Sequence, residues 1–99
     1  MSTTRKALNA ICDHLKVDLH EVIKAFGTTI PETGYKTKKA LIAVVTNPKN
    51  WRICMVEKHR VWPGVVIYSF DCEPFDDQLR GYVYVDSTKD IIHLEVQGE

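Results

Sequence analysis

The residues best suited to chemistry are lysines clustered near the middle of the chain. Lys36, Lys38 and Lys39 fall within four positions, at the start of an apolar segment with helical spacing. Acids are preferred at a helix N-terminus by about 0.3–1 kcal/mol each, so lysines there oppose the helix. They are either a solvated turn that tolerates this cost or an anion site, in which lysines and backbone N–H groups bind a phosphate. With Lys16 and Lys24 in support, the anion site predicts salt-dependent nucleic-acid binding without sequence specificity.

A second charged cluster, of opposite sign, falls in the loop expected over residues 71–78. Its members are Asp71, Glu73, Asp76 and Asp77. They do not match a calcium-binding loop, because the glycine and the terminal glutamate are missing. The cluster is either a solvated loop or an acidic docking surface for a basic protein. In the second case it resembles the acidic faces of phage-encoded inhibitors of host nucleases, which stand in for DNA.

Aromatic residues are the other candidate contacts. Tyr82 and Tyr84 alternate along one expected strand, and Tyr68 and Phe70 alternate along another. Such rings stack on bases in sheets that bind single strands, contact a protein partner, or form core and cross-strand pairs. Two tryptophans bracket the first strand and are expected at the core edge or in an interface: Trp51 and Trp62.

The four histidines and three cysteines show no catalytic or metal-binding spacing. The signatures of zinc proteases, serine hydrolases and nucleotide-binding loops are absent from the sequence. The cysteines, at positions 12, 54 and 72, are odd in number and far apart, which is typical of reduced, partly buried thiols in a cytosolic protein. We therefore predict no enzymatic activity, no cofactor and no metal site.

The two charged clusters belong to opposite halves of a chain with zero net charge. Residues 1–50 hold eight basic and four acidic residues, and residues 51–99 hold five basic and nine acidic, so the halves carry +4 and −4. This asymmetry indicates nucleic acid or another charged partner. With 99 residues, 44% of them hydrophobic, the chain predicts a single domain over 1–99, with a basic half (1–47) and an acidic half (50–99). The sequence shows neither a membrane-spanning run nor a signal-peptide pattern, which favours the cytoplasm.

The lysines must be positioned by helices. Apolar residues recur at three- and four-residue spacing in three segments, which predicts helices over 4–15, 19–26 and 36–45. One of residues 2–4 caps the first helix. After a break at residues 16–17, Asp18 and Glu21 fit a capping box that begins the second helix.

Two segments of this helical half resemble DNA-binding units. Residues 10–26, AICDHLKVDLHEVIKAF, resemble the helix-turn-helix of DNA-binding regulators, with Cys12 as the small residue and Val22 as the β-branched core residue. The segment departs from that family at Lys16, where glycine is usual. Residues 33–45 resemble the helix-extension-helix of SAP-type modules. Both resemblances imply DNA contact, although two short helices with a tight turn are also a common packing unit.

The acidic half changes to the two-residue period of strands. Alternation predicts four strands, over 51–57, 65–70, 81–85 and 91–96. Trp62-Pro63-Gly64 fits a type II turn. Short connections favour an antiparallel meander. The predicted fold is α+β: an N-terminal three-helix unit packed on a C-terminal four-stranded antiparallel β-meander.

The sequence therefore predicts a small cytoplasmic, nucleic-acid-associated regulatory protein that contacts phosphates through its basic helical half. The alternative is a protein-binding inhibitor, of the phage-encoded anti-host or anti-defence kind, that acts through its acidic sheet half. No membrane partner is expected. A homodimer that pairs at an open sheet edge is compatible with both hypotheses.

Overall fold

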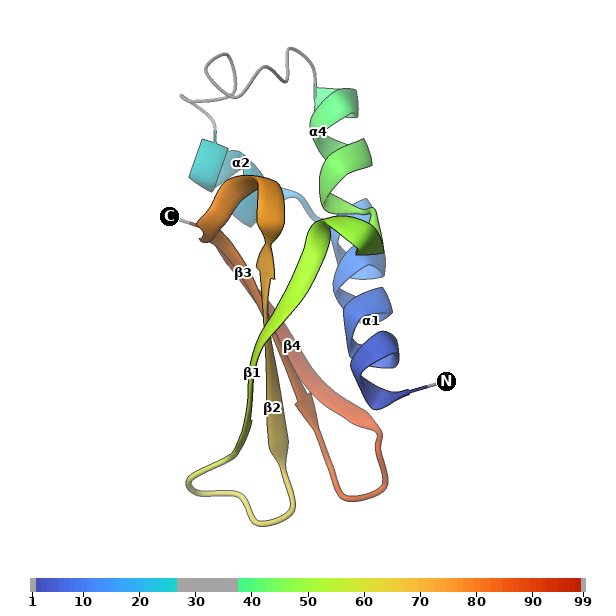
Figure 1. Cartoon of the computed structure of the whole chain (residues 1–99), viewed down its shortest axis with the longest axis vertical. Coiled ribbons are helices and arrows are strands. Elements are labelled where there is room, and N and C mark those ends of the chain that lie inside the picture. The colour runs from blue at the N-terminus through green and yellow to red at the C-terminus, as the bar shows by residue number, and fades with distance from the viewer. Residues whose placement is uncertain (1, 27–37, 99) are drawn as a thin grey trace.

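A computed structural model of the chain describes residues 2–26 and 38–98 (Figure 1). Within these residues, three helices come first: α1 (Thr3–Val17), α2 (His20–Phe26) and α4 (Lys38–Val45). Four strands follow: β1 (Trp51–Lys58), β2 (Val66–Cys72), β3 (Asp76–Val85) and β4 (Ile91–Gly98). Two short 3-10 turns, η1 (Pro48–Asn50) and η2 (Glu73–Phe75), precede β1 and β3. The α+β prediction, with helices before an antiparallel sheet, is confirmed.

The sheet is a meander in the order β1-β2-β3-β4, with every neighbouring pair antiparallel. The turn between β1 and β2 is the predicted type II turn. Gly64 adopts φ +79°, the left-handed conformation that this turn requires at its third position. The Val65 N–H closes the turn by donating to the Trp62 carbonyl at 3.3 Å.

The core lies between the helices and one face of the sheet. The predicted apolar face of α1 is buried as a whole: Ala7, Leu8, Ile11, Cys12 and Leu15. Gly81 lets β3 approach this helix, because a Cβ at Gly81 would lie 2.6 Å from Ile11 Cδ1. On α4, the Val45 carbonyl accepts a hydrogen bond of 2.7 Å from Trp51 Nε1, so α4 is tied to the start of β1. Trp51 is buried at the core edge, as predicted.

The junction of α1 and α2 differs from the prediction. The helix does not break at residues 16–17 but continues to Val17, and the Asp18 N–H still donates to the His14 carbonyl. The Asp18 carboxylate accepts from the His20 N–H at the start of α2, as a cap does. The Glu21 carboxylate makes a contact that the capping box did not predict: its Oε2 accepts from the Gly98 N–H at 3.2 Å and so ties α2 to the end of β4.

The prediction of an acidic loop over residues 71–78 is also wrong. Asp71 and Cys72 belong to β2, one 3-10 turn follows, and β3 already begins at Asp76. Phe75 explains the short connection, because its buried side chain holds the turn against the core. The acidic residues therefore lie on or beside regular strands.

Candidate functional site

The candidate site is the sheet face opposite the helices, which we call the open face. Cross-strand register places three rows of side chains on it: Arg52–Asp71–Arg80–Gln97, Met55–Ser69–Tyr82–Glu95 and Glu57–Ile67–Tyr84–His93. The alternate residues of β2 and β3, such as Phe70 and Val83, point into the helix-packed core. In Figure 1, all the labelled helices lie on one side of the sheet. Within the described residues, the open face is therefore left for solvent or a partner.

Four rings form a continuous ladder at one end of the open face. Trp62 stacks on His59 with ring centroids 4.7 Å apart and an interplanar angle of 12°. His59 lies 5.9 Å from the Tyr84 ring, and Tyr84 meets the edge of His93 at 5.1 Å. The ladder thus joins the β1–β2 connection to β3 and β4.

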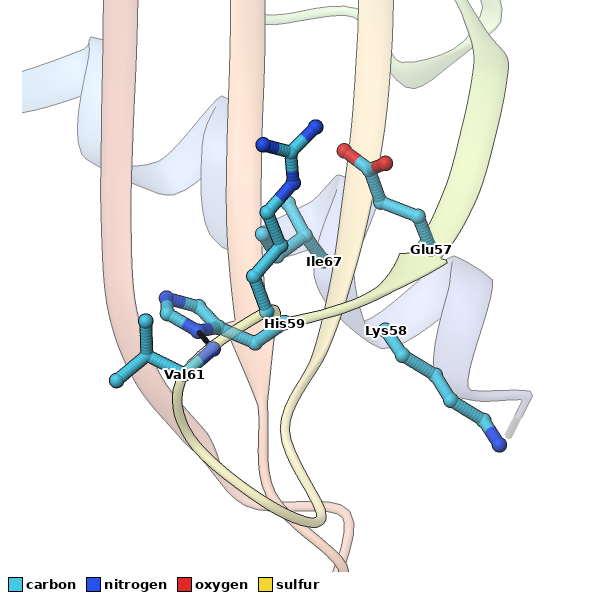
Figure 2. Close-up of a pocket in the computed structure, with 6 residues that line it drawn as sticks. Glu57, Lys58, His59, Val61 and Ile67 are labelled. Atoms are coloured by element: carbon cyan, nitrogen blue, oxygen red, sulfur yellow. Dashed lines mark hydrogen bonds between the residues drawn. The ribbon is translucent and has the colours of Figure 1, made fainter.

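His59 is held in one orientation by the backbone of the β1–β2 connection. Its Nδ1 accepts hydrogen bonds from the Val61 N–H at 3.0 Å and the Trp62 N–H at 3.1 Å, and Figure 2 shows the first of these bonds. Both donors are backbone amides, so Nδ1 must be unprotonated in this arrangement. The same bonds place the Trp62 ring over the imidazole, so the outer end of the ladder is preorganised.

Glu95 supports the inner end of the ladder. The Tyr84 hydroxyl donates to Glu95 Oε1 at 3.5 Å, and His93 Nε2 lies 3.8 Å from Glu95 Oε2. Burial and the Glu95 carboxylate raise the pKa of Tyr84 above its ordinary value, and Glu57 contributes in the same direction. Tyr84 is therefore a neutral phenol between two carboxylates, an arrangement that attracts a cation.

Hollows lie beside the ladder and farther along the open face. One is lined by residues of the β1–β2 connection and its flanking strands: Glu57, Lys58, His59, Arg60, Val61 and Ile67 (Figure 2). The other lies farther along the open face and is lined by Cys54, Met55, Glu57, Ser69, Asp71, Arg80 and Tyr82. Each hollow mixes apolar with charged side chains.

Exposed apolar residues concentrate in β1 and in the β1–β2 connection. Among the described residues, eight large hydrophobic side chains are exposed, and five of them fall between positions 53 and 62: Ile53, Met55, Val56, Val61 and Trp62. We call these five the β1 apolar cluster. Of these side chains, Met55 lies on the open face, whereas Ile53 and Val56 lie on the helix-packed side of the sheet, so the cluster is divided between the two sides of β1.

The structure brings none of the predicted phosphate-binding lysines together within its described part. Lys16 lies in the last turn of α1, with Nζ 3.3 Å from the Asp13 carboxylate. Lys39 is exposed in the first turn of α4. The side chains of Lys24 and Lys38, and the whole of Lys36, lie outside the described residues.

The first residue of the predicted acidic surface does not lie at an exposed position. Asp71 is buried, and its Oδ1 lies 3.1 Å from Nε of Arg80, directly opposite on β3, so it serves a structural ion pair rather than an exposed docking surface. Glu73 is exposed on η2. The side chains of Asp76 and Asp77 lie outside the described residues.

The four predicted aromatic residues do not form one platform. Tyr82 and Tyr84 lie half-buried on the open face, whereas Tyr68 and Phe70 point to the helix-packed side. Sequence reasoning missed His59 and His93, because they are 34 positions apart with no motif between them. The pairing of Tyr84 with His93 follows from the meander once its register is known, but no sequence signal folds His59 over β3.

The three cysteine thiols differ in burial. Cys12 and Cys72 are buried, and burial raises the pKa of Cys12 to about 11 and that of Cys72 to about 12. Cys54 is exposed, contrary to the prediction that the cysteines are partly buried, because it lies on the edge strand β1, where every residue after Trp51 is exposed. Partial burial and hydrogen bonding to Asp71 still raise the pKa of Cys54.

Comparisons with known proteins do not indicate what the site binds, so we interpret the site from its chemistry. Neither a scan against protein-family models nor searches of curated proteins and solved structures find a match to this chain. In the described ranges, no helix is both long and apolar enough to span a membrane.

Proposed function

We propose that the protein binds a basic segment of a protein partner through the open face of its sheet, centred on the ring ladder. The observation that carries this proposal is the preorganised run of Trp62, His59 and Tyr84, with the exposed side chain of Met55 on the same open face. Trp, Tyr, Met and Arg are the residues enriched in the centres of protein interfaces, and the open face supplies all four. In this proposal the chain is a small cytoplasmic regulator or inhibitor of its partner.

The charge of the open face indicates whether the partner is a protein or a nucleic acid. The three rows of the open face carry two arginines and three acids: Arg52, Arg80, Glu57, Asp71 and Glu95. Surfaces that bind nucleic acid are strongly positive, because the phosphate contacts supply most of the affinity. An open face without excess positive charge therefore favours a protein.

The charges around the ladder also indicate what that protein presents. Glu95 contacts Tyr84 directly, and Glu57 lies two strands away on β1 in the same cross-strand row, with Ile67 of β2 between them. A cation over an aromatic ring is stabilised by about 0.5–2 kcal/mol, and nearby carboxylates add to this attraction. A lysine or arginine side chain of the partner, stacked on the ladder, fits this arrangement.

The experiment is affinity capture from nuclease-treated lysate of the native host, with variants of the two halves compared. We expect wild-type protein to retain one stoichiometric partner. Trp62→Ala combined with Glu95→Lys is expected to reduce capture at least tenfold, because it removes an anchor ring and reverses the charge beside Tyr84. The matched control, Lys16→Glu with Lys39→Glu, changes only the helical half and should retain the partner. Circular dichroism confirms that each variant is folded.

The opposite pattern would support the nucleic-acid hypothesis, which the stacking potential of the ring ladder also favours as a second candidate. In that case the chain retards single-stranded DNA or RNA at low salt, the lysine variant abolishes retardation, and no protein is retained after nuclease treatment. Retention that is unaffected by both sets of substitutions would overturn the open face as the binding site.

A further inference from the structure

We infer that β1 pairs with β1 of a second copy of this chain, antiparallel, about a two-fold axis between Cys54 and Met55. The strand lies at the edge of the sheet, and among the described strands it pairs only with β2 (Figure 1). Seven of its eight residues are exposed. The inference goes beyond the proposed function because it uses the strand edge, whereas the proposed function uses the open face.

The backbone of β1 shows which residues point to the free edge. The His59 N–H donates to the Val65 carbonyl at 2.8 Å, toward β2. In an antiparallel ladder this orientation alternates, so Glu57 and Met55 also face β2, and Lys58 and Val56 face outward. The register shift between Ile53 and Met55 inserts one extra residue, Cys54.

That extra residue changes the alternation for the first part of the strand. Val56 lies opposite Tyr68, and Ile53 lies opposite Phe70, so both side chains are on the helix-packed side of the sheet although they are three positions apart. In a strand without a bulge, residues three apart would lie on opposite sides. The bulge also turns the Ile53 backbone outward, like that of Val56.

Ile53 and Val56 can therefore face each other across a two-fold axis. Antiparallel pairing of Ile53 with Val56 of the second copy is repeated by symmetry, which brings four exposed apolar side chains together on one side of the joined sheet. The exposed fractions of the two side chains are 43% and 51%, and the pairing covers this surface.

Charge complementarity selects the same register. Pairing Ile53 with Val56 places Arg52 opposite Glu57 of the second copy, on the open face, and symmetry again produces this contact twice. A shift by one residue aligns Arg52 with Lys58, which opposes like charges and mismatches the two sides of the strands. The exposed edge of β1 is thus self-complementary in backbone orientation, apolar contact and charge.

The product is an eight-stranded sheet in which the two open faces are continuous. All three exposed apolar side chains of β1, Ile53, Met55 and Val56, lie in the joined strands. The ring ladders stay outside the junction, because Trp62 and His59 belong to the β1–β2 connection and Tyr84 lies on β3. Self-pairing and binding to another protein can therefore be measured separately.

A charge swap tests the register by sedimentation equilibrium of the purified full chain. Wild type is expected to dimerise. Arg52→Glu and Glu57→Arg should each weaken dimerisation at least tenfold, because each substitution opposes like charges at two symmetric contacts. An equimolar mixture of the two variants should recover a heterodimer, since each of the two symmetric contacts then joins a glutamate of one variant to an arginine of the other. Trp62→Ala is the matched control on the ladder and should leave dimerisation unchanged.

A monomeric wild type at 100-fold the concentration used for partner capture would overturn the inference, and a dimer insensitive to both swaps would do the same. Val56→Lys gives a second variant in case Arg52→Glu fails to fold. Its side chain is half exposed in the single chain, so the variant should fold but not dimerise. Failure of dimerisation with partner capture intact would refute only this inference, and loss of capture with dimerisation intact would refute only the proposed function.

Discussion

Strands β1 and β3 place comparable apolar side chains on the same side of the sheet, yet only one strand is buried. On β3, Leu79 and Val83 are fully buried against the helices. On β1, Ile53 and Val56 point to that side but keep about half of their surface exposed. Burial here is decided by where the helices lie and not by how apolar the strand is. An apolar strand that the helices leave uncovered indicates contact with another chain.

The sharpest test of this comparison is the same substitution in both strands. Val83→Ala should lower the free energy of unfolding by about 2–3 kcal/mol, because it removes two buried methyl groups and leaves a cavity. Val56→Ala should change it by no more than about 0.5 kcal/mol. Urea denaturation, at a protein concentration low enough to limit self-association, measures both. Equal losses would show that β1 is covered within the single chain and would break the comparison.

Close packing of α1 on β3 predicts the next largest effect. Gly81→Ala should cost about 1–3 kcal/mol of unfolding free energy, because the added Cβ would lie 2.6 Å from Ile11 Cδ1. Ile11→Val removes that atom, so the double variant should lose less than the sum of the two single losses. Urea denaturation of all four proteins completes the cycle. Strict additivity would contradict direct packing of Ile11 on Gly81.

Local patterns in the sequence were sufficient to predict the helices and strands, but not the residues at which they begin and end. The apolar spacing of α1 predicted its buried face, and Pro63-Gly64 predicted the type II turn, because each signal depends on neighbouring residues alone. The start of β3 was missed, since consecutive acids at Asp76 and Asp77 disfavour a strand by propensity. Tertiary packing, including burial of Phe75 in the adjoining turn, overrides that preference.

The candidate site depends on how residues far apart in the sequence are placed together, which no local pattern contains. The ion pair of Asp71 with Arg80 requires the register of β2 on β3, and without it Asp71 had the features of a solvated acid. The ladder requires the β1–β2 connection to return His59 over the open face. Exposure of Cys54 depends on the place of β1 at the edge of the sheet. In each case the decisive relation joins residues or elements that are distant in sequence.

The cysteine thiols extend the comparison of buried and exposed regions to the pH dependence of stability. We expect the smallest effect here. Burial raises the pKa of Cys12 from 9.0 to about 11. The folded state therefore keeps this proton when the unfolded state releases it, so stability from this thiol is present below pH 9 and is lost as pH rises toward 11. A fully developed difference amounts to about 1.4 kcal/mol per pH unit.

Urea denaturation at pH 8 and pH 10 measures this loss. Wild type should lose about 1 kcal/mol more than Cys12→Ala between the two pH values, because the variant has no proton to release at that position. Cys54→Ala is the matched control on the exposed strand and should flatten the pH dependence less than Cys12→Ala, because Cys54 is exposed. Lysines and tyrosines also titrate in this range, but they are shared by all three proteins and cancel in the difference. If Cys54→Ala rather than Cys12→Ala flattened the pH dependence, the buried thiol would be the one on β1, and the assignment of covered and uncovered strands would be reversed.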